Sequence, residues 1–282
     1  MTIPKLKLTT QLIIDEATAR GLDVEMINPK KSFFVITDTS GKAHYLHSNS
    51  SSKTSAINHW IAKNKSLTYS LAKRFNVMVP ATENFVDPGS AKVFLSEYKS
   101  IVVKPVDAAH GNGVTVDVSD ETSLLSAVTV AKKYSSRIIL QQQIMGDDYR
   151  LLFIGDKLSA ASIREPASVV GDGVHSLAEL IIVENRNPDR GTNYQKKLNV
   201  IDQKAADHYL GDRIHTIPEE NERVSVVGTA NMGTGGRALD VTDVVDPMIV
   251  EAGLRITRGL DMGLCAVDFM VDPSQPEIPW LI

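Results

Sequence analysis

Residues 101–114, IVVKPVDAAHGNGV, carry the pattern that decides the fold. Three β-branched residues at the start predict a short buried strand that leads into Lys104. The small residues of 107–114 predict a loop. A lysine at a strand end can place its ammonium on a phosphate, and glycines let backbone N–H groups approach phosphate oxygens. The pattern G-x-x-x-x-G-K-[ST] is absent, so this is not a Walker A loop, and a solvated lysine before a turn is the alternative.

Working outward, the chain alternates between helical and strand periodicity. Helices are predicted after Thr54 and over 11–20, 67–75, 121–134, 177–185 and 247–261. Strands are predicted over 33–36, 101–103, 138–140, 151–153, 158–162 and 265–271, and from 278 onward. Hairpins are frequent and no G-x-G-x-x-G follows a first strand. The sequence therefore predicts an α+β fold without a dinucleotide site.

Composition limits the classes of protein to which this chain can belong. The 282 residues have a formal net charge of −4, and they leave room for one large domain or for two or three lobes. Basic residues are scattered, so no nucleic-acid partner is expected. Cys265 is the only cysteine, which excludes an internal disulfide and fits a reducing compartment. Signal-peptide and transmembrane patterns are absent, so we expect a cytoplasmic protein without a membrane partner.

A second candidate segment is 137–150, RIILQQQIMGDDYR. A strand that ends in polar residues before a Gly-Asp-Asp turn can offer backbone groups to a purine edge, and Asp148 can accept from ribose hydroxyls. An ordinary hairpin is the alternative. Arg150 and Arg164 suit bidentate binding of phosphate or carboxylate, and on alternating strands they can face a cleft. Each is also a common type of surface residue.

A third candidate segment, 231–237, reads NMGTGGR. Its three glycines and threonine predict neither a helix nor a packed strand. It is either a flexible loop or a loop of backbone donors that closes over an anion.

Asp268 interrupts the apolar strand 265–271, and period two places Val267 and Phe269 on the opposite face. A carboxylate in such a strand is costly to bury unpaired, so it needs a partner. We favour a hard cation, with a structural ion pair as the alternative. Motifs for zinc sites and for a nucleophilic serine are absent, and Cys265 is expected in the core.

Taken in order, these segments resemble the ATP-grasp ligases, most closely the ATP-grasp region of cyanophycin synthetases and the ligase half of bifunctional glutathione synthetases. The resemblance runs along almost the whole chain, and the order and spacing of the motifs carry it. They lie at 9–14, 64–68, 77–80, 103–114, 148–150, 164–173, 185–191, 231–243 and 263–268.

The resemblance implies an ATP-grasp fold, in which two α+β subdomains grip ATP between antiparallel sheets, with a small N-terminal α/β segment. The implied boundaries are 1–62 for the N-terminal segment, 63–136 for the central subdomain with its phosphate loop, and 137–282 for the C-terminal subdomain.

The resemblance also implies ATP and Mg²⁺ as cofactors and gives individual residues roles. The residues implied to contact ATP are Lys65, Lys104, His110, Gly111, Asn112, Gly113, Val114, Gln141, Gln142, Gln143, Ile144 and Asp148. The implied catalytic residues, which hold phosphate or the substrate carboxylate, are Arg150, Arg164 and Arg237. Asp268 is the implied Mg²⁺ ligand.

The implied activity is that of an ADP-forming carbon–nitrogen ligase, which joins the carboxylate of an amino acid or short peptide to an amine through an acyl phosphate. A non-catalytic ATP-binding module and an ATP-grasp kinase are the alternatives. Dimers and tetramers are common among similar proteins, so a homo-oligomer is compatible with the resemblance.

The chain departs from the family pattern at three places. Gln141 stands where a glutamate is common, and Arg237 is closer to the glutathione synthetases than to the cyanophycin synthetases. The family next presents a glutamate and an asparagine that complete the metal site, so we expect the natural chain to continue past Ile282.

Overall fold

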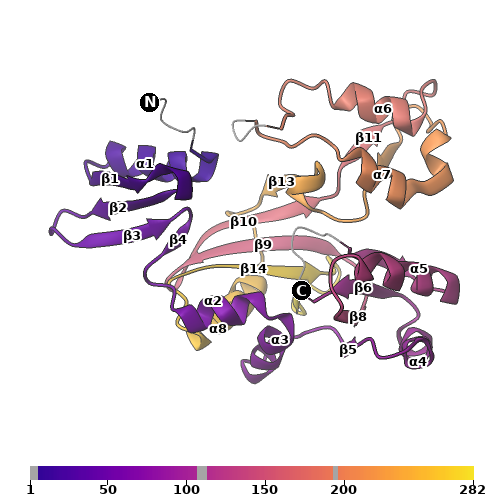
Figure 1. Ribbon diagram of the computed structural model, residues 1–282, viewed down its shortest axis with the longest axis horizontal. Helices are drawn as coiled ribbons and strands as arrows, with labels where there is room; N and C mark the ends of the chain where they lie inside the picture. Colours follow the sequence, from indigo (N-terminus) through magenta and orange to yellow (C-terminus); the bar gives the residue numbers. More distant parts are fainter. Residues whose placement is uncertain (1–5, 107–112, 193–195) are drawn as a thin grey trace.

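The computed structural model describes residues 6–106, 113–192 and 196–282. Three hydrophobic clusters form the interior. Figure 1 shows a small N-terminal sheet at one end, long strands across the middle, and two helical lobes at the other end. Across the described ranges, each helix falls short of the length and hydropathy that a bilayer crossing requires.

The N-terminal segment is a helix on a four-stranded antiparallel sheet of order β1-β2-β3-β4. Its elements are α1 (Leu8–Ala19), β1 (Asp23–Asn28), the 3₁₀ turn Pro29–Lys31, β2 (Phe33–Thr37), β3 (Ala43–His47) and β4 (Ser50–Ser51). The predicted helix stop at Gly21 is confirmed, because its positive φ of 72° suits the end of a helix.

Two helices link this segment to the rest of the chain, α2 (Ala56–Lys63) and α3 (Lys65–Arg74). The hydroxyl of Ser55 accepts from Asn58 N–H at 3.0 Å, so Ser55 and not Thr54 caps α2. Asn64 caps α3 in the same way. Lys65 therefore begins a helix whose position is set by its cap and by the burial of Tyr69 in the central core.

The next lobe is an antiparallel sheet of order β5-β8-β6-β7 covered by two helices. Its elements are β5 (Thr82–Asn84), α4 (Pro88–Tyr98), β6 (Ile101–Pro105), β7 (Thr115–Val118), α5 (Glu121–Lys132) and β8 (Ile138–Gln142). Since β8 lies between β5 and β6, the boundary that we placed after residue 136 falls inside this sheet.

The central sheet has the order β13-β10-β9-β14-β15. Its elements are β9 (Asp147–Ile154), β10 (Lys157–Glu165), β13 (Arg237–Asp240), β14 (Leu264–Val271) and β15 (Trp280–Leu281), and α8 (Pro247–Gly259) packs on one face. The predicted hairpin and the predicted alternation of β14 are confirmed, since Val267 and Phe269 are buried on the α8 face.

The remaining lobe forms between β10 and β13. It contains β11 (Ser168–Val170), α6 (Leu177–Glu184), α7 (Gln203–Leu210), the 3₁₀ turn Gly211–His215 and β12 (Arg223–Ser225). The capping box of Ser176 and Glu179 is confirmed. Our prediction that 231–237 holds no helix is wrong in one respect, because Met232–Thr234 forms a 3₁₀ turn. Asn231 caps this turn, and Gly235 ends it with a φ of +99°.

Candidate functional site

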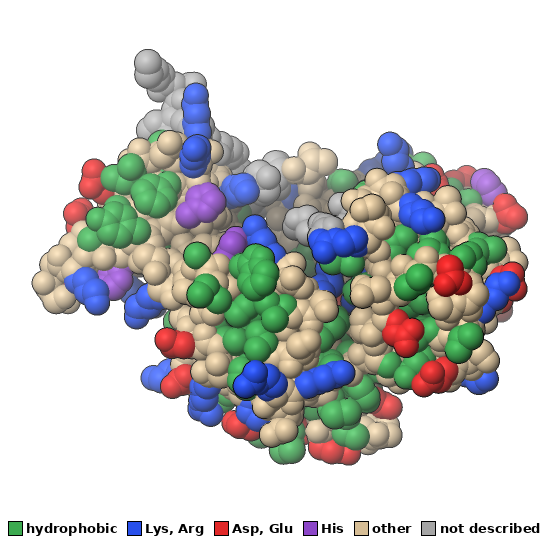
Figure 2. Space-filling view, turned by 60° about the horizontal axis from the view of Figure 1, so that its bottom comes forward, with side chains coloured by type: hydrophobic (Ala, Val, Ile, Leu, Met, Phe, Trp, Pro, Cys, Tyr) green, Lys and Arg blue, Asp and Glu red, His purple; other side chains and the backbone are tan. Residues whose placement is uncertain are grey.

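A cavity of about 590 Å³ lies between the sheet that contains β6 and β8 and the central sheet. The predicted site residues that line it are Lys65, Lys104, Val114, Gln141, Gln142, Gln143, Ile144, Asp148, Arg164 and Asp268. Figure 2 shows Lys and Arg side chains gathered about a hollow in the middle of one face of the molecule. Residues far apart in the sequence therefore line one cavity.

Lys104 is the residue before the last of β6 and is buried, with 8% of its surface exposed. Its Nζ donates to Gln141 Oε1 at 2.6 Å and to Tyr69 Oη at 3.3 Å. No carboxylate of the described residues forms an ion pair with it. Burial therefore lowers the pKa of Lys104 from its ordinary value of 10.5 to about 8.

Tyr69 and Thr82 hold Gln141 in place, and neither was predicted. Gln141 Nε2 donates to both hydroxyls at 3.0 Å, which fixes the amide so that its oxygen faces Lys104. Burial raises the pKa of Tyr69, so its phenol stays neutral. The tyrosine comes from α3, and the contact spans 72 positions in the sequence, which no local pattern encodes.

Backbone donors at the end of β8 and just after it differ in whether they are paired. Gln142 N–H donates to Ala81 O and Gln143 N–H to Ser100 O. Among the described residues, Ile144 N–H has no hydrogen-bond partner. A free backbone donor on the wall of the cavity suits a heterocycle with an acceptor nitrogen.

Gly146 lets this segment pass β14 at close range. Its φ is +139°, and a Cβ there would lie 2.3 Å from the carbonyl oxygen of Val271. Only glycine fits such a crossing, which brings the turn between β8 and β9 against the end of β14.

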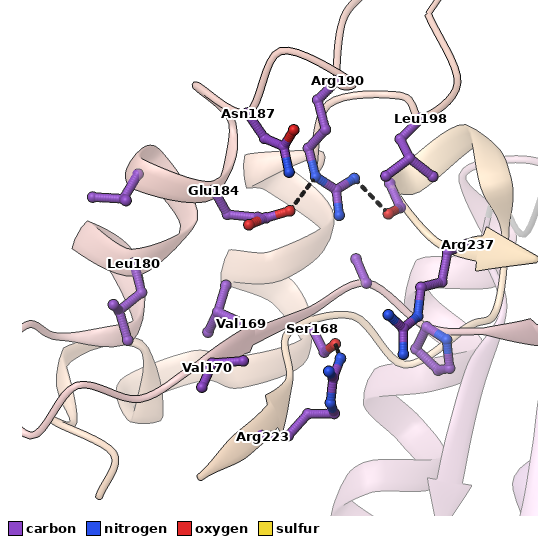
Figure 3. A pocket seen from close by; sticks show the side chains of 14 residues that line it. Ser168, Val169, Val170, Leu180, Glu184, Asn187, Arg190, Leu198, Arg223 and Arg237 are labelled. Atoms are coloured by element: carbon purple, nitrogen blue, oxygen red, sulfur yellow. Dashed lines mark hydrogen bonds and ion pairs between the residues drawn. The ribbon is translucent and has the colours of Figure 1, made fainter. Parts of the chain in front are cut away.

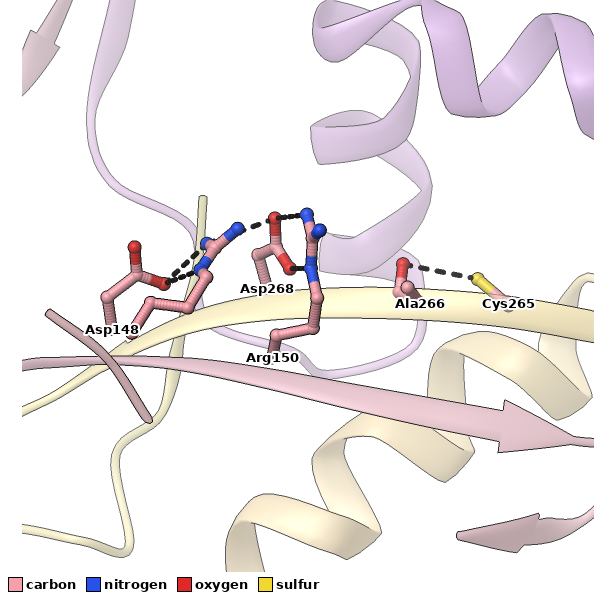
Figure 4. Close-up of polar contacts among 6 residues, drawn as sticks. Asp148, Arg150, Cys265, Ala266 and Asp268 are labelled. Carbon is pink, nitrogen blue, oxygen red and sulfur yellow. Dashed lines mark hydrogen bonds and ion pairs between the residues drawn. The ribbon is translucent and has the colours of Figure 1, made fainter. Parts of the chain in front are cut away.

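Four charged side chains alternate in sign across β10, β9 and β14 (Figure 4). Three of them, Asp148, Arg164 and Asp268, line the opposite wall of the cavity. Asp268 on β14 pairs in register with Arg150 on β9, and Asp148 on β9 pairs in register with Arg164 on β10. Arg150 donates to both oxygens of Asp268 at 2.8 and 2.7 Å. Arg164 Nη2 lies 2.5 Å from Asp148 Oδ1 and 3.2 Å from Asp268 Oδ2.

This quartet of Asp148, Arg150, Arg164 and Asp268 is balanced in charge. Hydrogen bonding to Asp268 raises the pKa of Arg150. Burial raises the pKa of Asp148, and the positive charge of Arg164 offsets only part of this rise. The partner that the sequence required for Asp268 is thus a pair of guanidinium groups. Asp148, which we assigned to ribose, is paired with Arg164.

Arg164 keeps part of its bonding capacity. A guanidinium has five N–H donors, and the hydrogen bonds to Asp148 use only Nε and Nη2. The two donors on Nη1 have no partner among the described residues. An incoming oxygen anion can therefore bind to Arg164 while the quartet stays intact.

The other predicted residues lie elsewhere. Arg237 pairs with Glu165 at 2.6 Å and lines a second cavity. Gly113 is described but does not line the main cavity, and His110, Gly111 and Asn112 lie outside the described residues.

The sequence reasoning also missed the segment 228–230, which lines the main cavity. A Cβ on Gly228 would lie 2.8 Å from the Tyr209 ring and 3.2 Å from Val116, so this glycine allows the segment to approach β7. The glycine-rich run that we singled out begins three residues later.

The carboxylates that line the cavity can hold a magnesium ion only if a substrate supplies further oxygen ligands. Across the described ranges, no group of three or more His, Cys, Asp or Glu residues clusters in a metal-binding arrangement. Asp148 and Asp268 are two carboxylates on one wall of the cavity. Mg²⁺ commonly binds one or two carboxylates and takes its other oxygen ligands from phosphate and water, so these two residues would suffice.

Comparison with known proteins gives a consistent result. No protein-family model matches the chain. The glutathione biosynthesis bifunctional protein GshAB of Listeria welshimeri is 30% identical over 274 residues, which cover 94% of this chain and 35% of that protein. The protein of the same name from Clostridium perfringens is 27% identical over 280 residues, covering 96% of this chain and 36% of that protein. The chain therefore spans about a third of the length of these relatives.

The crystal structure of a bifunctional glutathione synthetase from Pasteurella multocida has the same fold. It matches with a TM-score of 0.67 over 99% of this chain and 39% of that chain, at 24% identity. The predicted α+β ATP-grasp fold is thereby confirmed. With homology to the GshAB proteins along about 95% of its length, the chain belongs to the ATP-grasp ligases.

Proposed function

We propose that this chain joins a carboxylate to an amine at the expense of ATP, which is converted to ADP and phosphate through an acyl phosphate. The substrates we propose are amino acids or short peptides. The observation that carries the proposal is the cavity itself, because Lys104 lines one wall and Arg164 and Asp268 line the opposite wall. Cations for phosphate and a carboxylate for Mg²⁺ thus face a common space.

The nucleotide would bind along the β6–β8 wall. Ile144 N–H can donate to the purine, which supports the predicted role of residues 141–144 at the adenine. Lys104 and Lys65 line the same cavity and would bind phosphate oxygens. Asp268, together with Asp148, would hold Mg²⁺, which supplies charge compensation for the phosphoryl group when bound.

In the reaction, an oxygen of the substrate carboxylate attacks the γ-phosphorus and ADP leaves. The amine then attacks the carbonyl carbon of the acyl phosphate, and phosphate leaves as the amide forms. Arg164 would orient the carboxylate through its free Nη1 donors and stabilise the oxyanion that develops on the carbonyl. Arg150 would keep Asp268 in position.

The test is the release of ADP and phosphate from Mg-ATP with pools of amino acids and dipeptides. We expect release only when a carboxylate and an amine are both present, with a product whose mass equals their sum minus water. Lys104→Met should abolish turnover. Arg258→Gln is the matched control, because Arg258 is a half-exposed arginine on α8 outside the cavity.

Two outcomes would refute the proposal. ATP binding without turnover in any pool would favour a non-catalytic module. Formation of ADP without free phosphate, with the phosphoryl group on a hydroxyl, would favour a kinase.

A further inference from the structure

Figure 3 shows a second cavity, of about 320 Å³. It lies next to the proposed catalytic cavity, with which it shares Pro166 as a lining residue. It is enclosed by β11, α6, β12 and the segments around Arg190 and Gly235. Part of its lining is aliphatic, with Val169, Leu180 and Leu198 among the contributing side chains. Nothing in the proposed chemistry uses this space.

The arginines that line this cavity differ in whether a carboxylate neutralises their charge. Arg190 is buried and pairs with Glu184 at 2.8 Å, and Arg237 pairs with Glu165 at 2.6 Å. Arg223 is different, because it donates to the hydroxyl of Ser168 at 2.9 Å and forms no ion pair among the described residues. Figure 3 shows Arg223 and Arg237 on the same side of the cavity. The cavity thus carries one positive charge in excess.

The two cavities meet at one short segment. Pro166 lines both of them. Glu165 lines the catalytic cavity and accepts a hydrogen bond from Arg237, which lines the second one. A substrate held at Arg164 on β10 can therefore extend past Glu165 and Pro166 without crossing a sheet.

From this arrangement we infer that the second cavity binds the distal part of a peptide-like substrate that carries its own carboxylate, with Arg223 as the anion-binding residue. This inference rests on the proposed function, since it names the substrate class of the same site. The aliphatic lining would contact the carbon chain of the substrate, and Arg223 would bind the distal carboxylate with charge-assisted hydrogen bonds. Arg223 would thereby determine specificity without contacting the reacting atoms.

The test uses direct binding, so its result does not depend on turnover. The probes are alanyl-glutamate and alanyl-glutamine amide, which has the same N-terminal ammonium but lacks both carboxylates. Each is titrated by calorimetry into the whole chain with and without ADP. We expect alanyl-glutamate to bind, with ADP present or absent, and to lose about tenfold in affinity in Arg223→Gln, as expected for one charge-assisted contact. Alanyl-glutamine amide should bind weakly to both proteins.

Two further variants sharpen this test. Arg213→Gln removes an exposed arginine of the same lobe that does not line the cavity, and it should bind alanyl-glutamate normally. Val170→Glu places a carboxylate at a half-exposed lining position, and it should weaken binding at least as much as Arg223→Gln. Thermal unfolding of each variant verifies that it folds.

Equal affinity of alanyl-glutamate for the wild type and Arg223→Gln, or no binding to the wild type, would overturn the inference. Either result leaves the proposed ligase activity standing if turnover with other substrates is seen. Conversely, Arg223-dependent binding without turnover in any pool would support the inference as a binding site while the proposed catalysis fails.

Discussion

Asp268 and Arg150 lie directly opposite each other on β14 and β9, and the guanidinium donates one hydrogen bond to each carboxylate oxygen. The same carboxylate also lies 3.2 Å from Arg164, so two cations converge on it. Removing its charge should therefore affect both arginines, and with them the wall of the cavity.

Asp268→Asn should reduce kcat at least 100-fold, because an oxygen ligand for Mg²⁺ is weakened and Arg150 and Arg164 lose their shared counter-ion. The quartet is partly exposed, so the loss in free energy of unfolding should be only about 1 kcal/mol. Steady-state kinetics and urea unfolding measure the two effects. A drop in activity that merely follows a loss of folded protein would contradict the role given to Asp268.

The pKa of Lys104 predicts how nucleotide affinity depends on pH. Because burial lowers this pKa to about 8, the free protein loses the ammonium above pH 8, and ADP should bind progressively more weakly there. Calorimetry from pH 7 to 10 measures this, and Lys104→Met should show weak, pH-independent affinity over the same range. Unchanged affinity of the wild type up to pH 10 would exclude Lys104 as the phosphate-binding group.

Folding stability should change in the opposite direction. The folded pKa of about 8 lies below the ordinary value of 10.5, so between these two pH values the unfolded chain holds more protons. The contribution of Lys104 to the free energy of unfolding therefore rises with pH across this window. Comparing wild type with Lys104→Met by urea unfolding at pH 8 and pH 10 isolates it.

Gln141→Glu tests why a neutral side chain stands beside Lys104. A carboxylate at the position of Oε1, 2.6 Å from Nζ, would raise the pKa of the lysine and shift the pH dependence of ADP binding upward by about one unit or more. Gln141→Met, which cannot ionise, should leave the midpoint at or below that of the wild type. An unshifted midpoint in Gln141→Glu would show that this contact does not set the lysine pKa.

Arg190 supports the second cavity rather than binding a ligand. Its side chain is only 5% exposed, and besides Glu184 it donates to the carbonyls of Asn199 and Gly235 at 2.8 Å. Arg190→Met should lower the free energy of unfolding by about 3 kcal/mol, because three acceptors lose their donor. Arg186→Met, at an exposed position nearby, should cost less than about 0.5 kcal/mol. Similar losses in both variants would contradict this account.

Much of the fold follows from local patterns. Asp246 and Pro247 mark the start of α8, and the period of two in 265–271 places Asp268 on the cavity side of β14. Helices α4 and α7 were not predicted, although Asp87 and Asp202 cap them, because we looked for apolar periodicity and these helices are short.

Local sequence patterns could not predict the contacts within the site. Arg150 meets Asp268 across 118 positions, and Lys104 meets Tyr69 across 35, so both depend on strand order and on the packing of α3. The residues implied by the resemblance converged on one cavity with the exceptions of Arg150, Arg237 and Gly113 among those described. The pairing of Asp148 with Arg164 could be seen only once the register of β9 and β10 was known.

The most direct test of the central claim follows the oxygen atoms. Pools of amino acids and dipeptides with ¹⁸O in their carboxylates are incubated with the chain, Mg-ATP and an amine, and the products are analysed by mass spectrometry. An acyl phosphate intermediate predicts that one ¹⁸O atom appears in the released phosphate and that ADP is the nucleotide product. Release of unlabelled phosphate, or of ¹⁸O-labelled AMP with pyrophosphate, would contradict it.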